Sequence, residues 1–253
     1  MSQSDPYTIP VLDHGFVRLR NLAGPTRRDS VHVIDGANDY VTHRAFDADD
    51  TDAPNAARMS FDQTDTGRTR AQDLKLADYL MRNKHTSPFE MVQVWLEMKL
   101  PIFLARQFVR HRTVRLNEVS GRYVQLPAEW YIPTRFGAAA KDKKQGQAGG
   151  LRDIDNEWCR VNLNEDCRNG YAHYVEAIDR GAAMEHARFF LHVNHYTHWL
   201  WNQDLHNLMH FLSLRDHGHA QIEAQAYAKA IDQLVRTHLP ATMELYDQHR
   251  RLA

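Results

Sequence analysis

The chain has 253 residues, enough for one large domain or two small ones, and a formal net charge of −1 at pH 7. A dedicated nucleic-acid-binding protein is usually basic overall, so this charge disfavours that class. No apolar run approaches the roughly 18 residues that a transmembrane helix needs, and the first residues do not resemble a signal peptide. We therefore expect a protein with no membrane span and no nucleic-acid partner.

The two cysteines, Cys159 and Cys167, fall within one predicted helix. Their eight-residue separation covers more than two helical turns, which is too far for an easy disulfide. Free thiols are typical of a reducing compartment, so we expect a cytoplasmic protein.

The first half of the chain predicts short elements. We expect strands at 15–22 and 31–34, a solvated acidic loop at 47–52, a short helix at 55–61 and an amphipathic helix at 73–83. Pro88 disfavours helix before it and so predicts a turn at 85–90. A half-buried strand follows at 91–99, because apolar residues alternate there with polar ones.

The second half is mostly helical. Helices are expected at 153–180, 182–191, 204–214 and 219–239, with an aromatic core segment at 196–201. Segment 136–150 is rich in Ala, Lys, Gln and Gly, which predicts a flexible loop without chemistry. Neither a dinucleotide-binding nor a Walker glycine pattern occurs. We expect one domain over 1–253.

The most informative stretch is 110–122, which holds four arginines, a histidine, a carboxylate and a serine. Pro101 is a good first helical residue, and 102–112 has few helix breakers, so Gln107 and Arg110 would share a helix face. Beyond the helix, an extended chain would place Glu118, Ser120 and Arg122 on one side. Arginine forks match phosphate geometry, so these groups could bind one anionic ligand. A basic surface helix followed by a turn is the plainer interpretation.

The same stretch resembles the signature of flavin-dependent thymidylate synthases: Arg-His-Arg at 110–112, seven residues, then Ser120 and, two beyond, Arg122. Further blocks are similar to that family in the same order. They are His-Thr-Ser-Pro-Phe-Glu at 85–90, Glu-Trp-Tyr-Ile-Pro at 129–133, Phe-Leu-Ser-Leu-Arg at 211–215 and His-Ala-Gln at 219–221. The chain departs from the common pattern at Met91, Arg115, Asp204 and His206, where many members carry His, Ser, Asn and Arg.

The resemblance implies an α+β fold with a small antiparallel sheet and a helical portion. It also implies an obligate homotetramer with active sites shared between subunits. The implied reaction methylates dUMP to dTMP, with 5,10-methylenetetrahydrofolate as carbon donor and NADPH as reductant through FAD. Neither cysteine lies in a matching block, so we do not expect an enzyme thiol to attack the uracil.

The resemblance also implies site residues, with Arg215 and Ser120 in catalytic roles. The dUMP-binding residues would be Gln107, Phe108, Val109, Arg110, Glu118, Val119, Ser120, Gly121, Arg122, Arg188 and Arg215. The FAD-binding residues would be His85, Ser87, Arg110, His111, Arg112, Glu118, Asp204, Leu205, His206 and His210.

Two other classes stay open. The chain has 16 histidines, and His206 and His210 lie four apart on a predicted helix, a spacing that suits zinc, so a His-rich metallohydrolase is one alternative. HExxH and CxxC sequences are missing, however, and we predict no metal site. The arginines of 106–122 could instead serve a non-enzymatic nucleic-acid-binding module, which would show steep salt dependence.

Overall fold

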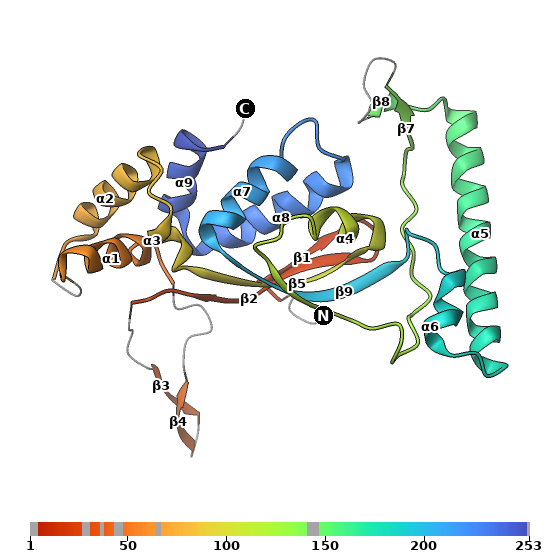
Figure 1. Cartoon of the computed structure of the whole chain (residues 1–253), viewed down its shortest axis with the longest axis horizontal. Coiled ribbons are helices and arrows are strands. Elements are labelled where there is room, and N and C mark those ends of the chain that lie inside the picture. Colours follow the sequence, from red (N-terminus) through yellow and green to blue (C-terminus); the bar gives the residue numbers. More distant parts are fainter. Residues whose placement is uncertain are drawn as a thin grey trace.

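The computed structural model describes residues 5–26, 31–35, 38–42, 48–63, 67–140 and 147–251. A five-stranded antiparallel sheet in the order β1-β2-β5-β9-β6 runs through the molecule (Figure 1). Its strands are β1 (Thr8–Val11), β2 (Gly15–Ala23), β5 (Gln93–Pro101), β6 (Arg115–Glu118) and β9 (Tyr196–Asp204). The expected α+β class with a small antiparallel sheet is therefore confirmed.

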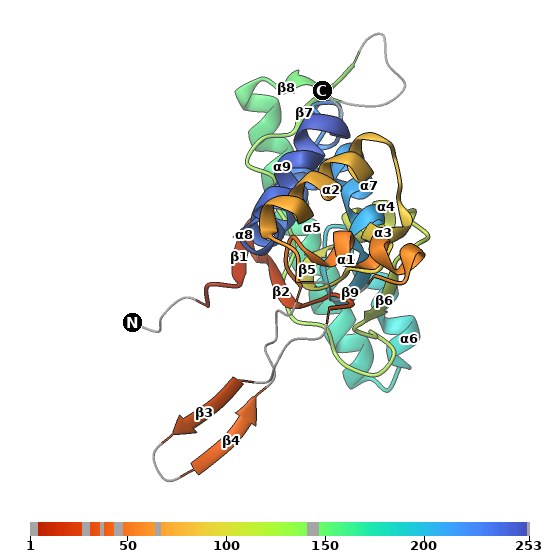
Figure 2. The ribbon, with the colours of Figure 1, turned by 90° about the vertical axis from the view of Figure 1, so that its left-hand side faces the viewer.

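Helices account for most of the remaining chain. They are α1 (Asp52–Arg58), η1 (Met59–Phe61), α2 (Arg70–Arg82), α3 (Ser87–Glu90), α4 (Ile102–Phe108), α5 (Asp153–Asp179), α6 (Met184–Ala187), η2 (Arg188–Phe190), α7 (Leu205–Arg215), α8 (Ile222–His238) and α9 (Pro240–His249). Two small antiparallel hairpins join β3 (Val31–Asp35) to β4 (Asn38–Thr42), and β7 (Gly137–Ala139) to β8 (Gln147–Gly150). The first of these hairpins projects away from the sheet (Figure 2).

The strands β5 and β9 form the centre of the sheet. They pair from Gln93 opposite Asp204 to Pro101 opposite Tyr196. Along β5 the buried residues Val94, Leu96 and Met98 alternate with partly exposed ones. Alternate side chains point to opposite faces of a strand, so this pattern places one face of the sheet in the core, as the sequence predicts.

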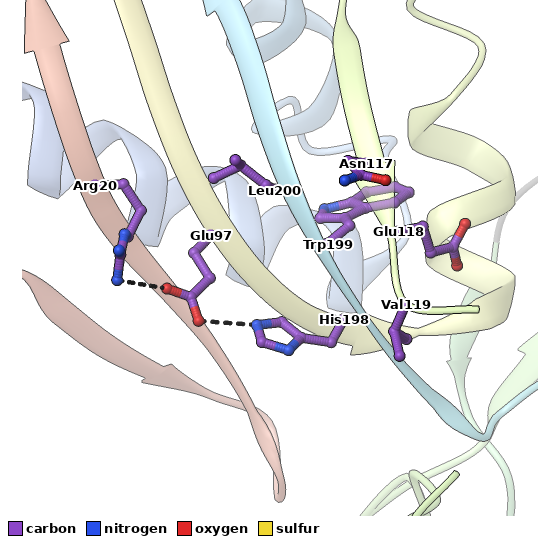
Figure 3. Close-up of a pocket in the computed structure, with 8 residues that line it drawn as sticks. All are labelled: Arg20, Glu97, Asn117, Glu118, Val119, His198, Trp199 and Leu200. Carbon is purple, nitrogen blue, oxygen red and sulfur yellow. Dashed lines mark hydrogen bonds and ion pairs between the residues drawn. The ribbon is translucent and has the colours of Figure 1, made fainter. Parts of the chain in front are cut away.

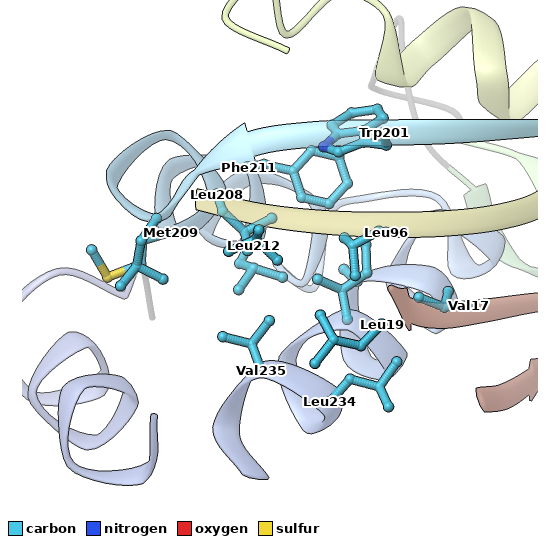
Figure 4. Close-up of a cluster of buried hydrophobic side chains, with 14 of the residues drawn as sticks. Val17, Leu19, Leu96, Trp201, Leu208, Met209, Phe211, Leu212, Leu234 and Val235 are labelled. Atoms are coloured by element: carbon cyan, nitrogen blue, oxygen red, sulfur yellow. The ribbon is translucent and has the colours of Figure 1, made fainter. Parts of the chain in front are cut away.

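The helices α7 and α8 cover that buried face (Figures 1 and 4). Leu96 and Trp201 from the sheet lie in one cluster with Phe211 from α7 and Val235 from α8, all fully buried. Burial of one such side chain contributes roughly 1.5–3 kcal/mol, so this cluster fixes both helices against the sheet.

The opposite face of the sheet carries no helix among the described elements (Figures 1 and 2). Glu97 occupies the middle of this face and accepts hydrogen bonds from Arg18 and Arg20 at 3.3 and 3.2 Å, and His198 Nε2 lies 2.9 Å from it. The helix α5 stands beside the sheet, separate from the helical layer (Figure 1). Polar groups therefore dominate one face and apolar side chains the other.

The structure corrects the helix expected at 102–112. The helix α4 ends at Phe108, with Val109 as its C-terminal cap, so Gln107 and Arg110 do not share a helix face. The chain instead turns toward β6, which pairs with β9 along the edge of the sheet. The extended chain expected to carry Glu118, Ser120 and Arg122 on one side is correct for Glu118, which ends β6, but wrong beyond Ser120. The backbone N–H groups of Tyr123 and Val124 both donate to the carbonyl of Ser120, which makes a tight turn.

Four smaller features also differ from the sequence prediction. The helix at 182–191 divides into α6 and η2. A further helix that the sequence did not predict, α9, begins at Pro240, as suits proline in a first turn. The supposed loop at 136–150 contains the β7–β8 hairpin, with 141–146 outside the described residues. The acidic loop is not solvated, because Asp50 is 1 % exposed and accepts hydrogen bonds from the backbone N–H and the hydroxyl of Thr242 in α9.

The long helix α5 is confirmed, and Gly181 ends it with a φ of 90°. Its apolar side chains, however, are only partly buried. Ile154, Trp158 and Val161 are all more than half exposed within the single chain. That face of α5 has no partner among the described residues.

Candidate functional site

The 110–122 stretch follows the edge of the sheet. Its central residues form β6, whose Arg115 lies opposite Asn202 and whose Glu118 lies opposite Trp199 of β9. The backbone N–H of Val119 extends this pairing by donating to the carbonyl of His198 at 2.8 Å. The stretch therefore has three parts: a loop before β6, the strand itself, and the turn after it.

The loop before β6 meets the end of α7. Arg215 Nε donates to His111 Nε2 at 3.1 Å, and Arg215 Nη2 lies 3.3 Å from the carbonyl oxygen of Gln107. The side-chain amide of Gln107 donates to Gln221 Oε1 at 2.6 Å. Residues more than a hundred positions apart are thus brought together in what we call the Arg215 group: Gln107, His111, Arg215 and Gln221.

The Arg215 group carries an unneutralised positive charge. A guanidinium can only donate, so His111 Nε2 must be an acceptor and the imidazole must be neutral. Burial, with the neighbouring Arg215 and His210, lowers the pKa of His111 to about 4. Burial also lowers the pKa of Arg215, but an arginine remains protonated at neutral pH. Among the described residues, the half-buried guanidinium of Arg215 therefore hydrogen-bonds only to neutral acceptors.

The turn after β6 meets α6 and η2. Arg122 Nε lies 3.1 Å from Glu185 Oε2, and Arg188 Nε donates to the carbonyl of Glu185 at 3.2 Å. A Cβ added to the buried Gly121 would lie 3.6 Å from Arg188 Cδ and 3.3 Å from Leu126, so the backbone passes close beside Arg188. The structure thus brings together a second set of predicted residues, the Arg188 group: Ser120, Gly121, Arg122 and Arg188.

A third set lies at the start of α7. Asp204 caps this helix by accepting from the backbone N–H of Asn207 at 2.9 Å. His206, in the first turn, has its Nδ1 3.2 Å from Arg250 Nη1. Burial, followed by the charge of Arg250, lowers the pKa of His206. His210 lies one turn further along α7, where its ring centroid is 6.4 Å from that of His111.

The helix α3 packs against α7 and carries Ser87 as its exposed first residue. The exposed His85, just before α3, packs edge-to-face against Tyr79 with ring centroids 5.7 Å apart. The segment 85–90, predicted as a turn, forms the short helix α3 from Ser87 onward, with Pro88 in its first turn. It neighbours the start of α7, as the predicted FAD-binding residues require.

A cavity of about 490 Å³ lies on the helix-free face of the sheet (Figure 3). Glu118 and Val119 line one side of it, and the Arg20–Glu97–His198 network lines another. Glu118 also accepts a hydrogen bond of 2.5 Å from the hydroxyl of Thr197. The carboxylate of the signature is therefore fixed at the rim of an open, polar hollow.

The arginines of the loop before β6, and Arg215 beside it, differ from other arginines of the chain in their ion pairs. Among the described residues, Arg110, Arg112 and Arg215 have no carboxylate within 4.0 Å, whereas Arg58 and Arg251 each pair with at least one. Arg110 and Arg112 are exposed in the single chain. Guanidinium groups without a carboxylate partner are suited to bind a phosphate or a carboxylate.

Not every predicted residue presents its side chain to a ligand. Phe108 is fully buried and packs edge-to-face on Phe211 at 5.0 Å, and Leu205 is 1 % exposed, so only their backbones could contact a ligand. The sequence prediction also missed three residues whose polar side chains contact predicted site residues: Thr197, Gln221 and Arg250. Gln221 stands in the matching His-Ala-Gln block, and this was the one available signal for any of them.

The histidines do not gather into a metal centre. Within the described ranges, no group of three or more His, Cys, Asp or Glu side chains is placed to hold a metal ion. His206 and His210 instead contact Arg250 and the ring of His111. The metallohydrolase alternative is not supported, and neither is the nucleic-acid-binding alternative. In the part of the chain that the structure describes, no helix has the length and apolarity to cross a membrane.

By its resemblance, a chain with an antiparallel sheet whose edge strand carries this arginine-rich signature, beside α7 and its terminal Arg215, belongs to the class of flavin-dependent nucleotide-methylating enzymes. The chain matches the family described as Thymidylate synthase complementing protein over residues 42–241, and it belongs to that family, which is that of the flavin-dependent thymidylate synthases. The resemblance seen in the sequence is therefore confirmed.

Relatives and solved structures agree. A flavin-dependent thymidylate synthase from Thermus thermophilus is 41% identical over 244 residues, covering 96% of this chain and 80% of the relative. One from Treponema denticola is 38% identical over 245 residues, covering 95% and 82%. The structure of a UMP/dUMP methylase, PolB from Streptomyces cacaoi, bound with 5-Br dUMP, superposes with a TM-score of 0.78 at 27% identity, covering 96% of this chain and 99% of that one.

Proposed function

We propose that this enzyme reductively methylates dUMP to dTMP, with 5,10-methylenetetrahydrofolate as carbon donor and NADPH as reductant through FAD. The observation that carries the proposal is the Arg215 group. It holds a half-buried, unneutralised guanidinium against the Arg-His-Arg loop of the signature. The dUMP analogue bound by the PolB methylase supports the choice of substrate.

Arg215 would act on the pyrimidine. Carbon 5 of uracil is a poor nucleophile, and it becomes reactive toward a methylene carbon when negative charge develops on the ring's carbonyl oxygens, as in an enolate-like form. A fixed cation at the pyrimidine edge stabilises that charge, and it needs no reorganisation because His111 and Gln107 already hold it. His111 suits this role because a neutral acceptor orients the guanidinium without cancelling its charge.

The Arg188 group would hold the nucleotide. Ser120 offers a hydroxyl, Arg122 and Arg188 offer guanidinium donors, and Gly121 allows the backbone to approach closely. Arg188 bonds only a backbone carbonyl among the described residues, so its charge is available to a phosphate.

The residues near α3 and α7 fit a flavin. Ser87, Asp204, His206 and His210 would hold it together with Arg110 and Arg112, whose donors are free of carboxylates among the described residues. A bound flavin supplies hydride chemistry that no side chain can provide. The protein's own contribution is to align the pyrimidine ring with the flavin ring. Holding the two reactants in contact lowers the activation free energy.

A homotetramer would complete the site. The Arg215 and Arg188 groups lie at opposite ends of β6, so within one chain they do not close around a ligand. The apolar stripe Ile154, Trp158 and Val161 on α5 is exposed in the single chain and would be covered by another copy. Light scattering after gel filtration should give the mass of four chains, and a monomer would contradict this part of the proposal.

The deciding experiment is the flavin absorption spectrum of the purified protein, recorded with and without dUMP. We expect flavin absorbance that shifts on addition of dUMP, because the nucleotide would stack beside the flavin ring. A colourless protein that gains no flavin absorbance with added FAD would contradict the proposal. Both cysteines are free, in keeping with a cytoplasmic enzyme.

A further inference from the structure

The helix α9 is followed by two consecutive arginines with different surroundings. Arg251 pairs with Asp216 at 2.7 Å and with Asp232 at 2.8 Å, so its charge is neutralised within the fold. Arg250 has one polar side-chain partner among the described residues, the ring of His206 at 3.2 Å. One arginine therefore belongs to the structural framework, and its neighbour keeps an unneutralised charge.

The partner of Arg250 is itself neutral. A guanidinium has no acceptor atom, so His206 Nδ1 must accept the hydrogen bond and cannot carry a proton. The nearby carboxylates do not neutralise the charge of Arg250. Asp204 is engaged as the cap of α7. Burial lowers the pKa of His206 and the charge of Glu90 acts in the opposite direction, but Glu90 forms no ion pair with Arg250 within 4.0 Å. This arrangement repeats the contact between Arg215 and His111 at the other end of the same helix.

The two arginines bracket a row of imidazoles along α7. His206 and His210 are one turn apart, His210 lies beside His111, and His111 accepts from Arg215. The nine positions from His206 to Arg215 correspond to roughly 13 Å of helix. A ligand with an aromatic ring at one end and a negative charge some distance away would match this row.

We propose that Arg250 binds a phosphate group of the flavin cofactor and that His206 is the residue that positions its guanidinium. The inference rests on the proposed function, which places His206 at the flavin. It goes further by assigning a binding role to Arg250, the C-terminal cap of α9, which lies outside the residues 42–241 that match the family model. It also gives a reason for the departure at position 206, where the family commonly has an arginine: here a cation from a different element contacts the residue at that position.

The test is flavin binding to the cofactor-free protein, followed by fluorescence with FAD and, separately, with riboflavin, which has no phosphate. Arg250→Gln should raise the Kd for FAD about tenfold or more, in line with the loss of a charge-assisted hydrogen bond, and leave the Kd for riboflavin unchanged. Added salt should weaken FAD binding to the wild type more than to the variant, because salt screens exposed charges. Arg180→Gln, on α5's C-terminal cap, removes an exposed arginine elsewhere and should change neither constant.

A second variant tests the geometry. Adding His206→Arg to Arg250→Gln returns a guanidinium to α7 and should recover FAD affinity to within about threefold of wild type. The inference is overturned if Arg250→Gln leaves FAD binding unchanged, if it weakens riboflavin and FAD equally, or if the double variant shows no recovery. A wild-type protein that binds neither flavin would instead overturn the proposed function itself.

Discussion

The buried Arg58 and the half-buried Arg215 have opposite electrostatic surroundings. Arg58 forms an ion pair with Asp73 in which both side chains are under 10 % exposed. Arg215 is half-buried and meets a neutral imidazole and a carbonyl. The first arrangement neutralises the charge within the fold, and the second leaves it available to a ligand. Mutations at the two places should therefore change different measurements.

The largest expected effect is on stability, at the framework arginine. Asp73→Ala leaves Arg58 buried without a counter-charge and should lower the free energy of unfolding by about 3–5 kcal/mol, measured by urea denaturation. Flavin binding to the folded fraction should not change. Asp153→Ala, at a side chain that is 95 % exposed, is the matched control and should shift stability by less than about 1 kcal/mol. If both variants lowered the free energy of unfolding equally, the buried ion pair would have no special role in stability.

The next effect is on turnover, at the ligand-facing arginine. Arg215→Ala should lower kcat/KM for dTMP formation roughly 10²–10³-fold, because it removes a preorganised cation from the pyrimidine. FAD should still bind with near-wild-type affinity. Arg180→Ala provides the control for loss of an arginine at a helix end. Loss of flavin binding and turnover together would instead make Arg215 a structural residue.

A smaller effect is expected from pH. The folded-state pKa of His111 is about 4, below the 6.5 of an unfolded histidine, so protonation favours the unfolded chain. Its contribution is fully present above pH 6.5 and is lost as the pH falls toward 4. Since the ring is partly exposed, we expect about 1–2 kcal/mol from this residue, after allowing for solvent screening.

Urea unfolding at pH 7 and pH 4.5 measures this contribution. His111→Gln should flatten the pH dependence, whereas His186→Gln, at an exposed ring on α6, should keep the wild-type slope. His195, whose pKa burial also lowers to about 4, accounts for part of the slope that remains. An unchanged slope in His111→Gln would mean that the imidazole is not buried as described.

The smallest effect belongs to the Arg188 group. Ser120→Ala removes one hydroxyl and should raise the Kd for dUMP about threefold to tenfold, the value of one ordinary hydrogen bond. FAD affinity should change less, which separates the nucleotide from the cofactor. Ser60→Ala, at an exposed serine in η1, should alter neither constant. If flavin binding falls more than dUMP binding, Ser120 belongs to a different ligand.

Local periodicity was enough to predict β5, α5 and α7, because their apolar residues repeat at the spacing of a strand or a helix. It failed for β6, whose four residues are all exposed and pair with β9 only because the sheet edge is there. It failed for Asp50, which is buried through contacts with Thr242, almost two hundred residues later. The signature predicted His111 as a site residue and the block at 211–215 predicted Arg215, but their mutual contact and that of His206 with Arg250 exist only in three dimensions.

The Asp50 contact has one more consequence. By binding the first turn of α9, it sets the rotation and axial position of a rigid rod of ten residues, roughly 15 Å long. Arg250 follows the far end of that rod, so a small tilt at the anchored end becomes a larger displacement of the guanidinium. Asp50 therefore helps to position Arg250, although the two residues lie at opposite ends of α9. The geometry of the contact between Arg250 and His206 depends on how firmly Asp50 holds the first turn of the helix.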